Sequence, residues 1–390
     1  MTIRLKCLLV TALLMIAASA NAQVTTSAIS GVVVDENKEA LIGATVVAKH
    51  VPSGTSYGAA TNIDGRYHIQ GMRTGGPYTI EISYIGYNVS QFSDVYLQLG
   101  NTSVIDAQME PTSTALAEVV VTGKGGTQAG AAKNFSLSKI ESTPTISRNV
   151  YDVVKNTPMV NVNKTGGITI AGANNRFNSF QIDGAVANDV FGLSATGTNG
   201  GQTSVNPISL EAVEELQVVI SPFDVRQSGF TGGGINAVTK QGGNAFHASA
   251  YTYYNNQDFY GRWNQQLGKK DPLTTQHTLT YGGNVSGAFI KDKLFFFVNV
   301  ERNEESYPST FYPGYNGSTY LTVNQAKQIL DHYYELTGGK FKDSYGQRDV
   351  ERKSTDLLAR VDWNISDKHK LALRYQHVDA FDDKYNPSAS

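Results

Sequence analysis

The sequence has 390 residues, and its 32 basic and 34 acidic side chains give a formal net charge of −2. Only 17% of the residues are charged, against about 25% in an average soluble protein. Lys and Arg form no basic cluster, which excludes nucleic acid as a partner. The single cysteine, Cys7, excludes a disulfide framework and a cysteine-ligated metal site.

The first residues predict a secretory signal peptide over residues 1–22. Two basic residues precede an apolar run over residues 7–18, which is too short to span a bilayer. A small-x-small pattern ends at Ala22, so we expect cleavage between Ala22 and Gln23. No apolar stretch of about 20 residues follows, so a membrane crossing would have to use β-strands.

Residues 24–110 contain short strand patterns separated by turn residues, which is typical of a small β-sandwich. Asp64 and Gly65 form a tight-turn signal, followed by the alternating Tyr67 and Ile69. The unit resembles the carboxypeptidase regulatory-like domain, a transthyretin-like sandwich, which implies an accessory module without enzymatic activity. The motifs that carry the resemblance are residues 31–35, 41–46, 61–69 and 84–87.

Residues 111–140 are rich in Pro, Thr, Ser, Ala and Gly and predict a flexible linker. Three consecutive valines inside it form a segment that can add as a strand to the sheet edge of another protein. The alternative is an ordinary last strand of the sandwich. The place of this segment resembles the TonB box, which implies that TonB binds it. The residues are Glu118, Val119, Val120, Val121, Thr122 and Gly123.

Residues 141–243 predict a mixed α/β unit, with a helix over 147–155 that ends before Thr157 and Pro158. Several stretches resemble the plug domain of TonB-dependent receptors of the Oar-like, OmpA-related type. The plug motif residues are Asn174, Asn175, Arg176, Asp183, Gly184, Asn188, Asp189, Gly232, Gly233, Gly234 and Asn236.

Two of these motifs invite a structural interpretation. Asp183 and Gly184 predict the hairpin turn of two plug strands; the alternative is a metal-binding carboxylate. The glycines at 232–234 indicate a close approach of two backbones. We expect them to let the end of the plug pass close to a barrel wall.

From residue 244 the sequence alternates in segments of about ten or more residues, which predicts transmembrane β-strands. In residues 355–366 the apolar side chains share one face and the polar side chains share the other, with Leu358 as the exception. Short turns near residues 292 and 368 contrast with a long connection over 305–351. Outer-membrane barrels have short periplasmic turns and longer external loops, and this sequence shows the same asymmetry. The predicted strands are 245–255, 276–290, 293–304, 355–366 and 369–378.

Five strands cannot close a barrel around a plug, which takes about 22 strands. We therefore expect residues 244–390 to be the start of a truncated barrel and the chain to be part of a longer reading frame. The predicted fold class is mainly β. It comprises a transthyretin-like β-sandwich, an α/β plug and the first strands of an incomplete transmembrane β-barrel.

The resemblance implies a TonB-dependent outer-membrane receptor that takes up a scarce solute of the siderophore, oligopeptide or glycan class. The implied partners are TonB with its ExbB–ExbD complex, outer-membrane lipid and an unidentified extracellular ligand, with the N-terminal domain in the periplasm of a Gram-negative bacterium. The alternatives are surface adhesion, a protein-secretion channel of the Oar type, and a periplasmic binding module.

One motif indicates a zinc enzyme, but its signal is weak. His332 and Glu335 have the HxxE spacing of zinc ligands, but a catalytic site needs a third ligand and a base around an open position. The residues lie in a predicted helix over 323–336 that starts with a capping signal. We therefore expect no catalytic residues, no metal and no cofactor.

Overall fold

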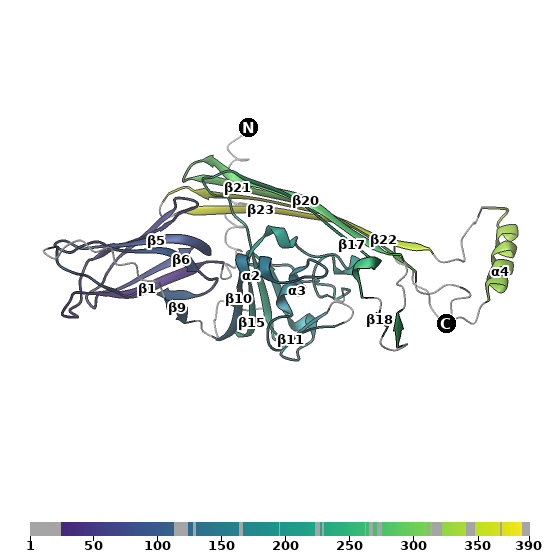
Figure 1. Cartoon of the computed structure of the whole chain (residues 1–390), viewed down its shortest axis with the longest axis horizontal. Helices are drawn as coiled ribbons and strands as arrows, with labels where there is room; N and C mark the ends of the chain where they lie inside the picture. The colour runs from purple at the N-terminus through teal and green to yellow at the C-terminus, as the bar shows by residue number, and fades with distance from the viewer. Residues whose placement is uncertain are drawn as a thin grey trace, which may run out of the picture.

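The chain folds into three units built on β-sheets, seen in the computed structural model of Figure 1. The signal-peptide cleavage site at Ala22 and Gln23 and the predicted TonB box over residues 118–123 lie outside the described residues. The structure describes residues 25–112, 124–127, 130–163, 167–194, 196–222, 227, 230–261, 263–264, 268–270, 275–309, 313, 322–340, 348–366 and 369–383.

The first unit, called the sandwich below, packs two sheets with the strand orders β4-β1-β7-β9 and β3-β2-β5-β6; β8 also pairs with β1. Alternating burial along β2 and β4 sends every second side chain into a core that includes Ile29, Val46 and Tyr78. The strands are β1 (Ser27–Val34), β2 (Thr45–His50), β3 (Ser56–Ala60), β4 (Arg66–Met72), β5 (Gly75–Ser83), β6 (Ser90–Leu97), β7 (Thr102–Val104), β8 (Ala107–Gln108) and β9 (Lys124–Thr127).

The second unit, called the plug below, has one mixed sheet of order β10-β15-β16-β13-β14 and a two-stranded sheet, β11-β12. β16 is buried along its whole length in the middle of the larger sheet. The elements are β10 (Gly130–Ser136), α2 (Leu137–Ser142), α3 (Val150–Val154), β11 (Val160–Val162), β12 (Ile168–Ile170), η1 (Asn175–Phe177), β13 (Ser179–Ile182), β14 (Ala185–Val186), η2 (Gly201–Thr203), η3 (Leu210–Ala212), β15 (Val213–Pro222) and β16 (Gly234–Thr239).

The structure differs from the flexible linker expected over residues 111–140. β9 pairs with β7 of the sandwich, and β10 pairs with β15 of the plug. The physical reason lies in β10, where Phe135 is 1% exposed and belongs to the plug core. A buried aromatic side chain and pairing with β15 along most of the strand outweigh the low strand propensity of the glycine and alanine residues around it.

The third unit is a long twisted sheet of order β17-β20-β21-β22-β23, called the barrel sheet below. Figure 1 shows it arching over the plug, with its β20–β21 turn near the sandwich and α4 at the far end. Its elements are β17 (His247–Asn256), η4 (Gln257–Phe259), β18 (Trp263–Asn264), β19 (Lys269–Lys270), β20 (His277–Ile290), β21 (Leu294–Pro308), α4 (Val323–Leu336), β22 (Asp349–Asn364) and β23 (Lys370–Asp382); β18 and β19 pair only with each other.

One face of the barrel sheet packs against the plug. On β22, Asp356, Leu358, Arg360 and Asp362 are each less than 9% exposed, whereas Trp363 is 45% exposed. Leu358, the exception to the polar face in the sequence pattern, is part of the plug core, as is Phe297 of β21. The predicted fold class, mainly β with a sandwich, a plug and barrel strands, is therefore confirmed.

Among the described residues, none of the helices combines the length and the apolar character needed to cross a membrane.

Candidate functional site

Asp183 lies in the turn between β13 and β14 and joins the plug to the barrel sheet. Asp183 and Gly184 both have positive φ, 48° and 78°, as a tight hairpin turn requires. The Asp183 carboxylate accepts hydrogen bonds from the backbone N–H of Thr239 at 2.9 Å and from its hydroxyl at 2.7 Å. Arg360 Nη1 lies 3.0 Å and Arg374 Nη1 3.4 Å from the same carboxylate. One side chain thus connects two strands of the plug with two strands of the barrel sheet.

Arg360 is held by carboxylates from two sides. Its Nε and Nη2 both lie 3.0 Å from the Asp362 carboxylate, and the Arg360 and Asp362 side chains are 9% and 8% exposed. Arg374 is directly opposite Arg360 in the strand register, so removing Asp183 would leave two like charges facing each other. We call Asp183, Thr239, Arg360, Asp362 and Arg374 the plug lock.

The motif residues around Asn174 fix the loop that precedes β13. Asn174 is the N-cap residue of η1, and its side chain accepts a hydrogen bond from the backbone N–H of Arg176 at 3.1 Å. The Arg176 guanidinium donates to the backbone carbonyl of Gly192 at 2.9 Å. Asn175 lies within η1, and Asn236 lies in β16.

Asn188 and Asp189 hold the chain after β14. Asn188 accepts a hydrogen bond from the backbone N–H of Phe180 at 2.7 Å and donates to the carbonyl of Asn178 at 2.8 Å. The backbone N–H of Ser194 donates to Asp189, and this hydrogen bond lowers the pKa of the Asp189 carboxyl. These motif residues shape the backbone of the plug, and Asn175 and Asn188 also line one small pocket within it, beside Phe180 and Ile235.

The glycines at 232–234 have a different role from the one expected. A Cβ at Gly232 or Gly233 would lie 2.3 Å from a side-chain atom of Asn178 or Ile170, both in the plug. The expectation that these glycines pass close to the barrel wall is wrong, because this segment packs inside the plug. Gly242 makes that approach instead: its Cβ would lie 2.4 Å from the Phe296 carbonyl oxygen.

A second contact between the plug and the barrel sheet is centred on Glu301. Its Oε2 accepts hydrogen bonds from Ser209 of the plug at 2.7 Å and from the Tyr251 hydroxyl at 2.8 Å. Gly282 lies between Tyr251 and Glu301 in the register, and a Cβ there would be 2.6 Å from the Tyr251 hydroxyl. The glycine therefore lets the Tyr251 ring cross β20 to reach Glu301.

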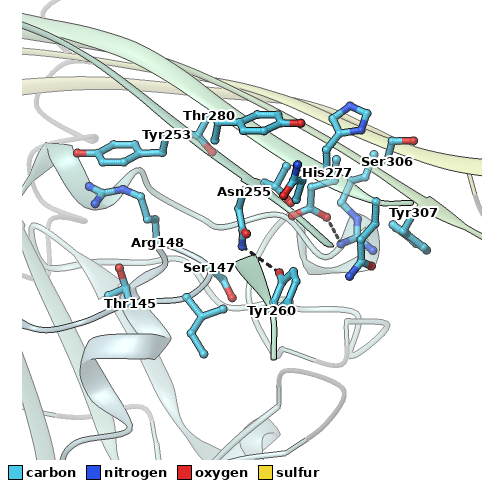
Figure 2. Close-up of a pocket in the computed structure, with 17 residues that line it drawn as sticks. Thr145, Ser147, Arg148, Tyr253, Asn255, Tyr260, His277, Thr280, Ser306 and Tyr307 are labelled. Atoms are coloured by element: carbon cyan, nitrogen blue, oxygen red, sulfur yellow. Dashed lines mark hydrogen bonds and ion pairs between the residues drawn. The ribbon is translucent and has the colours of Figure 1, made fainter. Parts of the chain in front are cut away.

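A cavity of about 530 Å³ lies between the plug and the end of the barrel sheet opposite the β20–β21 turn. This volume is within the range of about 300–1,000 Å³ of small-molecule sites. Figure 2 shows plug residues Thr145, Ser147 and Arg148 below it and the strand ends above it. The lining residues are Thr145, Ile146, Ser147, Arg148, Tyr253, Tyr254, Asn255, Asn256, Tyr260, Gln276, His277, Thr278, Thr280, Glu305, Ser306, Tyr307 and Arg352.

Strand alternation separates the side chains that face this cavity from those that face away. Tyr253 is opposite Thr280 in the register, and the guanidinium of the plug residue Arg148 lies against the Tyr253 ring, so both strand residues point inward. His277, an odd number of residues from Thr280, points to the outer face, as Figure 2 also shows. Sequence reasoning missed this cavity, because its walls come from the plug and from four strands.

The sandwich is bound to the plug through the backbone of Leu99. The Leu99 N–H donates to both oxygens of Glu215, at 3.0 and 3.1 Å, and the Leu99 carbonyl accepts from Gln217 at 2.7 Å and from Asn134 at 3.1 Å. Burial raises the pKa of the Glu215 carboxyl to about 8. The sandwich and the plug therefore share a buried, titratable contact.

The sandwich also contacts the barrel sheet near its β20–β21 turn. The backbone N–H of Asn244 donates to the Pro52 carbonyl at 2.7 Å, and the Asn364 amide donates to the Thr55 hydroxyl at 3.0 Å. The Lys370 ammonium lies 3.4 Å from the centre of the Tyr57 ring. The loop after β2 thus rests on the rim of the barrel sheet.

We expect replacement of Glu215 by Gln to remove a pH dependence of the contact between sandwich and plug. The folded pKa of Glu215 is above the ordinary value, so its protonated form contributes stability that is complete below the ordinary pKa of 4.5. That stability is lost as the pH rises through about 8, by at most about 1.4 kcal/mol per pH unit.

Hydrogen exchange of the Leu99 amide between pH 5 and pH 9 measures this effect after correction for the intrinsic pH dependence of exchange. Protection of the Leu99 amide should decrease as the pH rises in the wild type and should stay constant in Glu215→Gln. Equal slopes in the two proteins would show that another group titrates at this contact.

No group of three or more His, Cys, Asp or Glu side chains in the described parts of the chain is arranged to hold a metal ion. His332 and Glu335 lie in α4, whose start has the predicted capping box between Thr322 and Gln325. α4 stands apart from the plug and the sandwich in Figure 1. The HxxE spacing therefore belongs to an exposed helix of a long connection.

Two family matches cover separate parts of the chain. Residues 28–110 match the carboxypeptidase regulatory-like domain, and residues 238–314 match an outer membrane beta barrel domain. The chain is 26% identical over 268 residues to the TonB-dependent transporter Oar of Myxococcus xanthus, which covers 64% of this chain. The chain spans 24% of the length of Oar.

Solved structures with a similar arrangement include the outer membrane transporter YddB from Escherichia coli, with a TM-score of 0.44 and 16% identity over 64% of this chain and 33% of the other. The siderophore receptor PirA from Acinetobacter baumannii has a TM-score of 0.43 and 20% identity over 64% of this chain and 32% of the other.

Proposed function

We propose that this chain, a homologue of the TonB-dependent transporter Oar, serves in the TonB-driven uptake of a scarce solute across the outer membrane. The resemblance drawn from the sequence is confirmed by this homology and by the carboxypeptidase regulatory-like and outer membrane β-barrel matches. The protein belongs in the outer membrane of a Gram-negative bacterium, and it is a transporter homologue and not an enzyme.

The observation that carries this proposal is the binding of the plug to the inner face of the barrel sheet. Phe297 and Leu358 share a buried cluster with plug residues, and Arg360 binds Asp183 through a buried ion pair. A plug held in this way closes the lumen of a barrel. Passage of a solute then requires work on the plug, which an energised partner can supply.

The proposed site of that work is the segment over residues 118–123. Its valines suit strand addition to TonB, which together with ExbB–ExbD would transmit the energy of the inner-membrane proton gradient. β10 begins at Gly130, only seven residues after Gly123, and it is an edge strand of the plug sheet. A pull on residues 118–123 would act first on β9, which starts at Lys124 and is paired with β7 of the sandwich, and beyond β9 on β10 and β15.

The proposed substrate is a solute of the siderophore, oligopeptide or glycan class that enters through the cavity between the plug and the barrel sheet. The cavity has a suitable volume and contacts both units at the end away from the β20–β21 turn. A solute bound there would touch Arg148 and Ser147 of the plug, so its presence could be transmitted to the plug directly.

Replacing Val120 by Pro in the full-length transporter should weaken binding of the TonB periplasmic domain about tenfold or more. Proline removes a backbone donor and breaks the added strand, and the loss of one or two ladder hydrogen bonds corresponds to this factor. Isothermal titration with purified TonB measures the effect without knowledge of the solute.

Val120→Thr is the matched control, since threonine keeps the backbone donor and the β-branched shape. It should bind TonB with nearly the wild-type affinity. If Val120→Pro also binds TonB normally, residues 118–123 are not the TonB-binding segment, and the alternatives of adhesion, secretion or a last strand of the sandwich gain support.

A further inference from the structure

The positive charges that face the cavity are all compensated by carboxylates. Arg148 of the plug forms an ion pair with Glu211, and its guanidinium lies 3.6 Å from the centre of the Tyr253 ring. On the opposite wall, Arg352 lies between Glu305 at 2.9 Å and Asp382 at 3.4 Å, which are its partners on the two neighbouring strands. The two arginines are thus ion-paired with three carboxylates.

This arrangement disfavours an anionic ligand. An anion that bound Arg148 or Arg352 would have to displace a carboxylate already paired with that arginine. The displaced Glu211 or Glu305 would then remain beside a ligand of the same charge. Sites that select phosphate or carboxylate groups instead present a guanidinium fork that is free to form two parallel hydrogen bonds.

Apart from Arg352 Nε, which lies 3.4 Å from Asp382 without a hydrogen bond, the free hydrogen-bonding capacity of the cavity belongs to uncharged groups. Asn255 donates through Nδ2 to the Tyr260 hydroxyl at 3.0 Å, and Figure 2 shows the two side chains pointing toward each other. The Asn255 Oδ1 is buried and has no hydrogen-bond partner within the described parts of the chain. A buried acceptor without a partner is costly, and a ligand that donates a hydrogen bond removes the cost.

Hydroxyl groups and tyrosine rings surround this free acceptor. Thr278 and Thr280 face inward from β20 according to the register, and Thr145 and Ser147 lie on the plug side. Tyr260 lines the cavity and is 38% exposed, so part of its ring is open to a ligand. An aromatic surface next to paired donors and acceptors fits a ligand with apolar C–H faces and many hydroxyl groups.

We infer that the cavity binds an uncharged, hydroxyl-rich ligand, and that the solute is of the neutral oligosaccharide class. This inference rests on the proposed function only in treating the cavity as the entry site of a solute. It favours the glycan class among the three proposed classes, because both arginines that line the cavity are already ion-paired and an aromatic ring lies beside a free neutral acceptor.

A printed array of neutral and acidic oligosaccharides, probed with the full-length transporter in detergent, tests the inference, with ferric enterobactin as a separate anionic probe. We expect binding to neutral oligosaccharides and none to the acidic ones or to ferric enterobactin. Preference for an anionic probe, or an array without any bound neutral oligosaccharide, would overturn the inference.

Two variants assign the binding to this cavity. Tyr260→Ala should weaken binding of the best neutral oligosaccharide about tenfold or more through the loss of the ring and the hydroxyl, and Asn255→Leu should weaken it through the loss of the free acceptor Oδ1. Tyr281→Ala is the matched control, because Tyr281 lies on β20 next to Thr280 but faces the outer side. Equal effects of Tyr260→Ala and Tyr281→Ala would place the ligand elsewhere.

The failure of this inference can be told apart from the failure of the proposed function. The array measures binding alone, and the TonB titration with Val120→Pro measures coupling alone. A transporter that binds TonB through residues 118–123 but prefers an anion has the proposed function with another substrate. A protein that binds neutral oligosaccharides but not TonB has the proposed ligand without the proposed transport.

Discussion

Replacing Arg360 by Met should loosen the plug from the barrel sheet by about 3–5 kcal/mol, the cost of breaking a buried ion pair from one side. Without Arg360, Asp362 loses three hydrogen-bonded contacts, and Asp183 keeps Arg374, at 3.4 Å, and its two hydrogen bonds from Thr239. Both carboxylates remain buried, while the arginine that they share is gone. Native-state hydrogen exchange of the β16 amides, above all of Thr239, measures the free energy of local opening.

Arg302→Met is the matched control for this variant. Arg302 also belongs to the barrel sheet, but its side chain is 31% exposed and its ion pair with Glu304 lies on the opposite face. Exposed pairs contribute only about 0–1 kcal/mol. A double-mutant cycle with Asp183→Asn isolates the coupling between the plug and the sheet. If Arg360→Met and Arg302→Met have equal effects, the plug lock does not hold the plug.

Replacing Gly242 by Ala should prevent the chain from folding with a correctly seated barrel sheet. The added Cβ would lie 2.4 Å from the carbonyl oxygen of Phe296, 2.6 Å from that of Gly287 and 2.9 Å from the Phe296 nitrogen. All three are backbone atoms of paired strands, so no side-chain rotation relieves the clash. Overpacking typically costs about 1–3 kcal/mol, and we expect at least the upper end of that range here.

The thermal unfolding temperature of the purified protein in detergent, together with its yield of folded material, measures this effect. Gly261→Ala is the matched control: no atom lies within 4 Å of its Cβ position, and its φ is not in the left-handed region. Normal folding of Gly242→Ala would mean that the segment between β16 and β17 can move away from the barrel sheet.

The strands of the barrel sheet could be predicted from the sequence because each has one face toward the plug and one away. Arg360 and Asp362 were placed on the polar face of residues 355–366, and both are buried against the plug. Leu358 broke the pattern because it packs into the plug core, which no local signal reveals. The alternation of apolar and polar residues along a strand indicates on which face of the sheet a side chain lies. It does not indicate what packs against that face.

The partners of the motif residues could not be predicted. Asp183 and Gly184 were expected as a turn, but Arg360 is 177 residues away in the sequence. The glycines at 232–234 indicated a close approach without identifying what approaches, and the inferred neighbour was wrong. β10 escaped prediction because its one large apolar side chain, Phe135, is surrounded by residues of low strand propensity.

The short connection between β9 and β10 limits how far the sandwich and the plug can separate. β9 ends at Thr127 and is paired with β7 of the sandwich, while β10 starts at Gly130 and is paired with β15 of the plug. Even a fully extended chain spans only about 10 Å between these two residues. A larger displacement of the plug must separate β9 from the sandwich, separate β10 from the plug sheet, or move the sandwich together with the plug.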